Sequence, residues 1–386
     1  MDFELTEEQK LIRNTARQMA KERIAPRAAE IDETGEYPQD IFDLFKEQGF
    51  LGLDLPAKYG GAGAGALAQA LVIEEVCKYC HTSGMILICC TLGTRSIMIT
   101  GSEEQKQYYA SRVASGELRG AFGLTEPAAG SDPASMLTKA VRQGDDYVIN
   151  GEKCFISGAT VSDYFIVFAK TDPSAGARGV SVIIVPRDAP GFSVGKPDKK
   201  LGVTGMPTAP LIMEDCRVPV TNLVGREGGG FGTAMLSLNT QRAGPAARGL
   251  GLAEGALMYA VEYTRNRDAF GQKLCDFQAI QFMMADMVIQ IEAARHMVYH
   301  AAWLIEQGKY TREYAGILST AKAFATEMAV KVSSDALQLL GGHGYMREHP
   351  LERHYRDARQ LMLVEGTSQI QRVVIARALL DRAIVY

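Results

Sequence analysis

The segment Tyr147-Val148-Ile149-Asn150-Gly151-Glu152-Lys153-Cys154-Phe155-Ile156-Ser157 marks the place where the texture of the chain changes. It opens on β-branched and aromatic residues, which favour strands. Asn150-Gly151 predicts a hairpin turn, because both residues tolerate positive φ. Similar apolar runs follow at 164–169 and 180–185, with turn residues between them. Residues 121–230 are therefore predicted to form a small β-barrel-like domain.

Helical sequence lies on both sides of this β segment. Thr6-x-x-Gln9 and Ser102-x-x-Gln105 are capping boxes that predict helix starts, and Pro26 is expected to bound the first helix. The last third of the chain contains two long amphipathic stretches, and the second stops at Gly341-Gly342. Their apolar side chains recur at helical spacing: Ile280, Met284, Met287, Ile291, Ala294 and Val298 in one, and Ile317, Ala321, Phe324, Met328, Val332 and Leu339 in the other.

Together these patterns predict an α+β fold that is mainly α. An N-terminal helical domain is expected over 1–120, the β domain over 121–230, and a C-terminal four-helix bundle over 231–386. A chain of 386 residues is long enough for two or three domains.

Charge and composition exclude several classes of function. The net charge is −4 and no basic patch stands out, so nucleic acid is not an expected partner. No apolar run reaches the roughly 20 residues that a membrane helix needs, so no membrane span is expected. The first nine residues are acidic and lack a secretory pattern, and the seven cysteines form no framework. A cytoplasmic location is expected.

The cysteines between 77 and 90 raise the question of a metal or redox site, and Arg95 that of a substrate contact. Cys77-x-x-Cys80-His81 and Cys89-Cys90 lie in apolar helical sequence with no second pair at zinc-ribbon spacing, so no metal is expected. Arg95 either binds a substrate carboxylate or has a structural or surface role, and the second alternative is favoured.

Three glycine-containing motifs each allow two interpretations. Residues 124–132 are Leu-Thr-Glu-Pro-Ala-Ala-Gly-Ser-Asp. Their small side chains either let the backbone come close to a ligand or simply form a turn into the β domain. Residues 265–271 and Gln278 place two guanidiniums beside a phenylalanine. They either bind a pyrophosphate and a flat ring, or are basic residues that interact favourably with the dipole at a helix C-terminus. Residues 338–345 end a helix in exposed amides, which bind an anion or only cap the helix.

A fourth motif, 364–372, places Glu365 after an apolar run and just before an expected helix start at Thr367-Ser368. Partial removal from water raises the pKa of a carboxylate there and strengthens it as a base. The alternative is an acidic residue that merely favours a helix start.

In this order and with this layout, the motifs resemble those of the acyl-CoA dehydrogenase family over essentially the whole chain. The resemblance includes the opening Leu5-Thr6-Glu7-Glu8-Gln9, Thr-Glu-Pro-x-Ala-Gly-Ser-Asp at 125–132 and the Asn150–Ser157 segment. Arg-x-x-Phe-Gly, Gln-x-x-Gly-Gly-x-Gly and Glu-Gly-Thr-x-x-Ile-Gln complete it.

The resemblance implies a bound FAD and an acyl-CoA substrate. Its flavin ring would face Phe122, Leu124 and Thr125, with Ser131 and the Phe155–Ser157 segment at the ring or phosphates. Thr367 and Gln369 would lie near the adenosine half. A neighbouring subunit would contribute the remaining FAD contacts, from Arg267, Phe270, Gln278, Gln338 and Gly342. This implies a dimer at least, and the usual assembly in the family is a homotetramer.

Glu365 matches the family's catalytic base, with its own backbone N–H and a flavin ribityl hydroxyl stabilising the enolate that develops. Some relatives carry the base at the position of Gln241, which has no carboxylate here. Arg242 matches an arginine near coenzyme A or the base loop. Asn239 stands where many members have an aspartate that contacts pantetheine.

Other departures from the family bear on the acyl group. Val364 replaces a tyrosine found in many enzymes for linear chains, which leaves width beside Cα and Cβ. Ile88 and Leu92 are expected to shorten the pocket, and Gly366 adjoins it. The expected substrate is a short, branched or alicyclic acyl-CoA, with electrons passed to an electron-transferring flavoprotein. The alternatives are a linear butyryl-type enzyme and an enoyl-CoA reductase.

Overall fold

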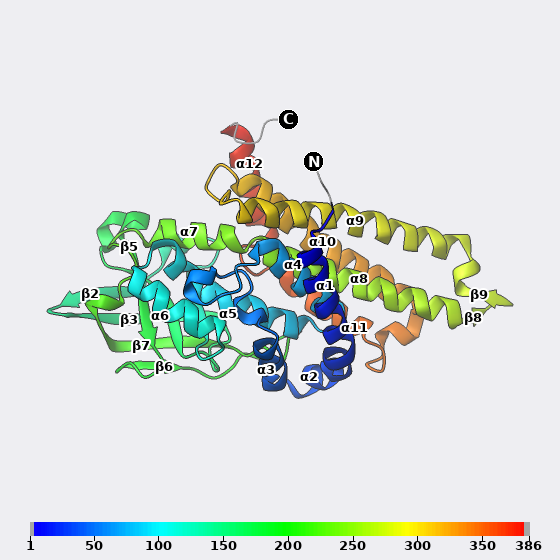
Figure 1. The fold of residues 1–386 in the computed structure, drawn as a ribbon, viewed down its shortest axis with the longest axis horizontal. Helices are drawn as coiled ribbons and strands as arrows, with labels where there is room; N and C mark the ends of the chain where they lie inside the picture. Colours follow the sequence, from blue (N-terminus) through cyan, green and yellow to red (C-terminus); the bar gives the residue numbers. More distant parts are fainter. Residues whose placement is uncertain (1–3, 382–386) are drawn as a thin grey trace.

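The computed structural model describes residues 4–381. Figure 1 shows an elongated molecule with one sheet at the left and long helices extending to the right. Helices precede and follow the sheet in the sequence. The predicted α+β, mainly α architecture is confirmed.

Six α-helices form the N-terminal part: α1 (Glu7–Met19), α2 (Ala28–Thr34), α3 (Gln39–Glu47), α4 (Gly65–Cys77), α5 (His81–Thr100) and α6 (Glu103–Ala114). Both capping boxes are present, at Thr6 and at Ser102. Pro26 does not mark the end of α1 itself, which stops at Met19. A π-helical turn and a 3₁₀ turn then carry the chain to α2, and Pro26 lies in the first turn of the 3₁₀ segment, where a missing N–H is tolerated.

The sheet is mixed and seven-stranded, in the order β1-β4-β2-β3-β7-β6 with β5 paired to β4. β1 and β2 run parallel to β4, and the other pairs are antiparallel. The strands are β1 (Gly120–Gly123), β2 (Lys139–Gln143), β3 (Asp146–Ser157), β4 (Tyr164–Lys170), β5 (Val180–Pro186), β6 (Phe192–Val194) and β7 (Thr208–Pro219).

The predicted hairpin turn at Asn150-Gly151 was wrong. Both residues lie inside β3, and the turn between β2 and β3 is at Gly144-Asp145 instead. The register with β7 shifts between Ile149 and Gly151, as at a β-bulge. A Cβ at Gly151 would lie 2.4 Å from Thr138 Oγ1, so glycine is needed here for a close approach within the sheet.

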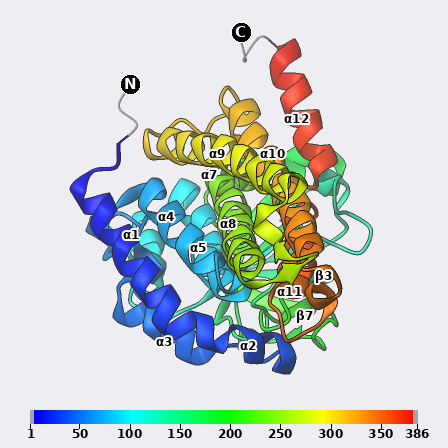
Figure 2. The same ribbon diagram turned by 90° about the vertical axis from the view of Figure 1, so that its right-hand side faces the viewer.

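The C-terminal part contains α7 (Gly230–Gln241), α8 (Ala243–Asn266), the short strands β8 (Asp268–Ala269) and β9 (Gln272–Lys273), α9 (Gln278–Glu306), α10 (Ala315–Leu339), α11 (Leu351–Leu361) and α12 (Ser368–Leu380). In Figure 2, α4 and α5 lie on one side of α8, and α10 and α11 lie on the other. One apolar core joins α8, α9 and α10 to the N-terminal helices. The sheet has a core of its own, and a further core packs one face of the sheet against α5, α6 and α7.

α5 is the central helix of the molecule. By length and composition it would suffice to cross a membrane, but 72% of its most apolar window is buried inside the protein. It packs against α4, α7 and β1, as a core helix does. The same helix places Ile88 against Gly244 at the start of α8.

Candidate active site

Glu365 lies on the turn that joins α11 to α12. Val364 N donates to Gln360 O at 3.1 Å, and Ser368 N donates to Met362 O at 3.0 Å, which closes the turn. Thr367 Oγ1 accepts from Ile370 N at 3.3 Å and caps α12, so the predicted helix start is confirmed. Glu365 itself has φ 53°, in the left-handed region that costs a non-glycine residue about 1–3 kcal/mol.

Three side chains hold the carbonyls of this turn: Arg242 between α7 and α8, Lys322 on α10 and Gln371 on α12. Arg242 donates to Glu365 O, and Lys322 Nζ on α10 donates to Gly366 O at 2.8 Å. Gln371 Nε2 on α12 donates to both carbonyls, at 3.3 Å and 2.9 Å. Lys322 is completely buried. These bonds fix the carbonyls of Glu365 and Gly366 and so restrain Glu365 in its strained conformation.

Opposing electrostatic effects act on the Glu365 carboxyl. Burial raises the pKa of Glu365, while Arg248, Arg242 and Lys322 act to lower it. Its Oε2 atom is enclosed and has no hydrogen-bond partner within residues 4–381. Burial also lowers the pKa of Lys322 to about 8. The result is a desolvated carboxylate with a free oxygen, a suitable acceptor for a proton from carbon.

Of the expected acyl-binding residues, Val364 lies on this turn, and Ile88 on α5 lies against the start of α8. Ile88 is buried, and its Cδ1 would lie 3.0 Å from a Cβ at Gly244 on α8. Val364 and Leu92 are half-buried. Gln241 Nε2 donates to Thr91 Oγ1 at 3.2 Å and supplies no carboxylate. The structure therefore leaves Glu365 as the carboxylate of this region.

The remaining three expected substrate residues are Asn239 at the end of α7, Arg242 between α7 and α8, and Gly366, which follows Glu365. Asn239 is buried and its amide donates to Tyr310 O at 3.0 Å. A Cβ at Gly366 would lie 2.7 Å from Gln371 Nε2, and the φ of Gly366 is 87°, so glycine suits both the close approach of Gln371 and the backbone conformation of the turn. Arg242 is buried, which lowers its pKa to about 10.

The residues expected around the flavin ring lie together at the edge of the sheet. Phe122 is on β1, and Leu124 and Thr125 follow it directly. Cys154 N donates to Thr125 O at 2.9 Å and so joins this loop to the segment with Phe155 and Ser157. The buried ion pair between Lys153 and Glu126, 2.7 Å long, fixes the same loop from inside. Ser131 is exposed farther along it.

Phe155 combines an exposed side chain with an unusual backbone conformation. Its side chain is 70% exposed and its φ is 60°, although phenylalanine rarely adopts that region. Phe270 shares both properties, with 97% exposure and φ 50°. Within the described chain, Phe155, Phe270 and Glu365 are three of only five non-glycine residues with positive φ. Such strain is typical of functional positions.

The second group of expected flavin contacts lies away from the first. The β8–β9 tip, which carries Phe270 next to Arg267, is at the right end of Figure 1, opposite the sheet. Every residue of this group is solvent-exposed: Arg267, Phe270, Gln278, Gln338 and Gly342. One chain therefore does not bring the two groups together. Thr367 and Gln369 lie at the start of α12.

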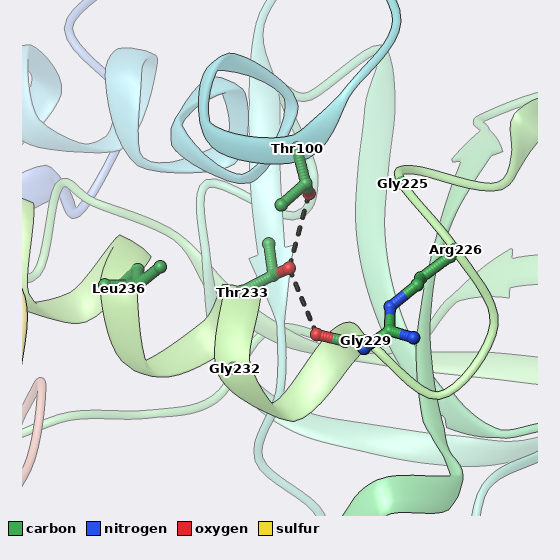
Figure 3. Close-up of a pocket in the computed structure, with 7 residues that line it drawn as sticks. All are labelled: Thr100, Gly225, Arg226, Gly229, Gly232, Thr233 and Leu236. Carbon is green, nitrogen blue, oxygen red and sulfur yellow. Dashed lines mark hydrogen bonds between the residues drawn. The ribbon is translucent and has the colours of Figure 1, made fainter.

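A separate hollow of about 490 Å³ lies between the end of α5 and the start of α7. Figure 3 shows Thr233 bonded to Thr100 Oγ1 at 3.3 Å and to Gly229 O at 3.2 Å, with Arg226 at the rim. None of the expected site residues lines it. It is thus distinct from the turn that carries Glu365.

Arg95 and three of the cysteines between 77 and 90 lie in the protein interior. Arg95 forms an ion pair with Asp54, and both side chains are almost fully enclosed, which agrees with the favoured structural role. Cys77, Cys80 and Cys90 are buried, and burial raises their thiol pKa values. Residues 4–381 contain no group of three or more metal-binding side chains.

Lys322, Gln371 and Arg248 were missed in the sequence. The available signal was a charged or polar residue on an otherwise apolar helical face, as at Lys322 between Ala321 and Ala323. Their partners lie far away in the sequence, so the pattern alone does not identify them.

The chain is similar over nearly its whole length to known proteins. Profiles of the acyl-CoA dehydrogenase N-terminal, middle and C-terminal domains match residues 6–117, 121–216 and 228–380. The chain is 44% identical to the short-chain specific acyl-CoA dehydrogenase of Clostridium acetobutylicum, over 97% of this chain and 99% of that protein. It is 43% identical to the acryloyl-CoA reductase (NADH) of Anaerotignum propionicum, over 99% and 97%.

A solved structure is equally similar. It comes from work on the electron-transferring flavoprotein of Acidaminococcus fermentans and flavin-based electron bifurcation. Its chain superposes with a TM-score of 0.95 and 44% identity, covering 98% of this chain and all of that chain.

Proposed function

Since the chain belongs to the acyl-CoA dehydrogenase family, whose members are FAD-dependent oxidoreductases acting on CH–CH groups, we propose that it converts a short acyl-CoA into the 2-enoyl-CoA. The acyl group is branched or alicyclic, and an electron-transferring flavoprotein receives the electrons. The observation that carries the proposal is the enclosed, unpartnered Oε2 of Glu365 on a strained turn.

Glu365 acts as the base that takes the proton from Cα of the thioester. An α-proton is too weakly acidic for a free carboxylate in water, so the developing enolate needs hydrogen bonds at its oxygen. The backbone N–H of Glu365 supplies one, since within residues 4–381 it donates to no backbone carbonyl. Phe122, Leu124 and Thr125 would hold the flavin ring of FAD, which would supply the acceptor for the hydride from Cβ.

The flavin is held by residues of two subunits. Phe122, Leu124, Thr125, Ser131, Phe155 and Ser157 bind the ring and phosphates in one chain, with Thr367 and Gln369 near the adenosine half. Arg267, Phe270, Gln278, Gln338 and Gly342 reach it from a neighbour, and their exposure at the opposite end of the molecule supports this division. The assembly is a homotetramer built from two dimers.

The width of the acyl pocket follows from Val364, with Ile88 and Leu92 limiting its depth and Asn239, Arg242 and Gly366 at the thioester end. The protein is cytoplasmic, needs no metal, does not bind nucleic acid and has no membrane span. Two alternatives keep the same site. Similarity to a short-chain specific enzyme favours a linear butyryl-type substrate, and similarity to an acryloyl-CoA reductase favours the reverse direction.

The test is anaerobic bleaching of the purified flavoprotein by a panel of CoA esters: butyryl, isobutyryl, 2-methylbutyryl, cyclohexanecarboxyl and octanoyl. Fast bleaching by the branched or cyclic esters is the expected result. Preference for butyryl or octanoyl would keep the reaction and reject the width argument. No bleaching by any ester, with FAD bound, would reject dehydrogenation.

A further inference from the structure

The segment 202–206 lies between β6 and β7 in the sequence, and it packs against α2 and α11. A Cβ at Gly205 would lie 2.6 Å from Ile31 Cγ2 on α2, and a Cβ at Gly202 would lie 2.5 Å from Asp357 Oδ1 on α11. Val203 is fully buried and has φ 51°, a conformation that a β-branched residue very rarely adopts. Such strain persists only where the surrounding structure imposes it.

Polar groups of α2 and α11 hold this segment from both sides. Val203 N donates to Asp357 Oδ1 on α11 at 2.5 Å. Thr204 Oγ1 donates to Asp32 O on α2 at 2.8 Å. Arg356 Nη1 on α11 donates to Asp32 Oδ1 at 3.0 Å and so joins the two helices beside the segment. The strained conformation of Val203 is therefore fixed by contacts to both helices.

Asp357 is a buried carboxylate with a single partner. Within residues 4–381 its side chain makes one hydrogen bond, to Val203 N, and no ion pair. Burial raises the pKa of Asp357 to about 6, while the Val203 N–H, Arg353 and Arg356 act to lower it. An apolar side chain would occupy this place on α11 without the cost of desolvating a carboxylate. The bond to Val203 is therefore the feature that requires an acceptor here.

One end of this link leads to the candidate base. Asp357 lies about one helical turn before the end of α11, and the turn that carries Glu365 follows directly. Gln360 O, near the end of the same helix, accepts from Val364 N at 3.1 Å and ties the turn to α11. A displacement of α11 therefore displaces Glu365 as well.

The other end leads to the expected flavin contacts. β7 begins at Thr208, which pairs with Ser157 on β3. Pro207 O, directly before β7, accepts from Gly158 N at 2.7 Å. The bond between the segment and α11 therefore joins the helix that leads to the base to the strand that carries expected flavin contacts.

We propose that Asp357 is a positioning residue: through Val203 it holds α11 against the flavin-binding edge of the sheet and so sets the distance between Glu365 and the flavin ring. This role rests on the proposed dehydrogenation with Glu365 as the base. Removal of a proton from Cα and of a hydride from Cβ requires the base and the flavin at fixed distances from one substrate. A misplacement of about 1 Å can lower the rate about 100-fold.

Two variants break the link in different ways, and two controls spare it. Asp357→Val removes the acceptor and nearly preserves the volume. Gly202→Ala places a Cβ 2.5 Å from Asp357 Oδ1 and 2.8 Å from the Arg356 carbonyl carbon, which pushes the segment away from α11. Asp357→Asn keeps an amide oxygen as acceptor for Val203 N. Thr204→Val removes the bond of the same segment to α2 and leaves the bond to α11.

Anaerobic stopped-flow bleaching by isobutyryl-CoA and butyryl-CoA gives the limiting rate constant and the half-saturation concentration for each holoenzyme. Asp357→Val and Gly202→Ala are expected to lower the rate constant about 10- to 100-fold, with the half-saturation concentration and the flavin content nearly unchanged. Hydrogen–deuterium exchange of the holoenzyme without substrate is a readout independent of turnover. Residues 361–367 should exchange roughly ten-fold faster in both variants, because the turn loses a support. Asp357→Asn and Thr204→Val should stay close to the wild type in both measurements.

A wild-type rate constant in a folded, yellow Asp357→Val protein would overturn the proposal. So would an equal loss in Thr204→Val, which would mean that the segment matters only for stability, or in Asp357→Asn, which would mean that the charge matters and not the bond. If Asp357→Val does not fold, Gly202→Ala decides by the same criteria.

Failure of the proposed function gives a different result. Bleaching of the wild type together with an undiminished rate constant in the variants leaves dehydrogenation intact and rejects only the role of Asp357. No bleaching of the wild type by any ester rejects both.

Discussion

Replacing Lys322 by methionine removes one of the bonds that hold the turn of Glu365 and leaves the volume nearly unchanged. Lys322 Nζ donates to Gly366 O at 2.8 Å from a fully buried position on α10. Gln371 still donates to the same carbonyl in the variant, so the turn loses a support without exposing an unpaired group. Exchange of a buried ion for an apolar side chain of similar size often preserves folding.

The magnitude follows from the type of bond. A hydrogen bond from a charged donor contributes about 1.5–3 kcal/mol. If that energy keeps Glu365 at its left-handed φ, its loss lowers kcat by about 10- to 100-fold, since about 1.4 kcal/mol corresponds to a factor of ten. Flavin content should not change, because Lys322 lies outside both groups of expected flavin contacts.

The pH profile gives a second, independent result. Glu365 accepts a proton only when ionised, so activity is present above its pKa and is lost as the pH falls through it. Lys322 acts to lower that pKa, and its removal should move the acidic limb of kcat/KM to higher pH. The pKa of Lys322 itself is about 8. In the wild type, Lys322 therefore loses its charge, and with it its lowering effect on the pKa of Glu365, as the pH rises past that value.

Steady-state assays with an electron acceptor dye, from pH 6 to 9, measure both effects. Lys331→Met on the exposed face of the same helix is the control and should behave as wild type. A Lys322→Met enzyme with wild-type kcat and an unmoved acidic limb would refute the argument that this lysine positions and tunes the base.

Three further changes test the remaining roles. Glu365→Gln should retain FAD and lose turnover by about 10⁴-fold or more, as expected for removal of an essential base; wild-type bleaching in this variant would mean that another group takes the proton. Arg267→Ala should lower flavin content and weaken the oligomer, because an exposed cation that reaches a neighbour's pyrophosphate would be lost; unchanged flavin absorbance and mass by light scattering would contradict this. Val364→Tyr should narrow the pocket and reduce kcat/KM for cyclohexanecarboxyl-CoA by about 10-fold or more relative to butyryl-CoA, an effect of the size of one to two methylene groups; equal losses for both esters would refute the width argument.

Local patterns predicted the elements of this fold well, because their causes are local. The capping boxes at Thr6 and Ser102 and the cap at Thr367 each depend on residues three positions apart. The failure at Asn150-Gly151 has the opposite cause. The dipeptide suits a turn, but pairing of β3 with β7 and the close approach of Thr138 place it in a bulge within a long strand.

The supports of the candidate base could not be predicted in the same way. Glu365 was recognisable because its motif is contiguous, whereas Lys322 and Arg242 reach its turn from 44 and 123 residues away. Arg95 shows the same limit, since its ambiguity is resolved by Asp54 on another segment. Ion pairs and hydrogen bonds between distant segments are properties of the packed helices, and a single sequence contains no periodic signal for them.

The three cations around Glu365 combine two requirements that conflict in a simple carboxylate. A strong base needs a high pKa, which burial provides, but it must also be ionised near neutral pH, which the cations provide. Arg242 and Lys322 also bind the carbonyls of the turn, so their removal changes position and charge together. Arg248 touches neither carbonyl, so its charge acts on Glu365 only through space. A variant whose pH profile shifts without loss of kcat at high pH would therefore have lost only the electrostatic effect on the pKa of Glu365. Replacement of Arg248 should give that result, whereas replacement of Lys322 should also lower kcat, because Lys322 positions the turn.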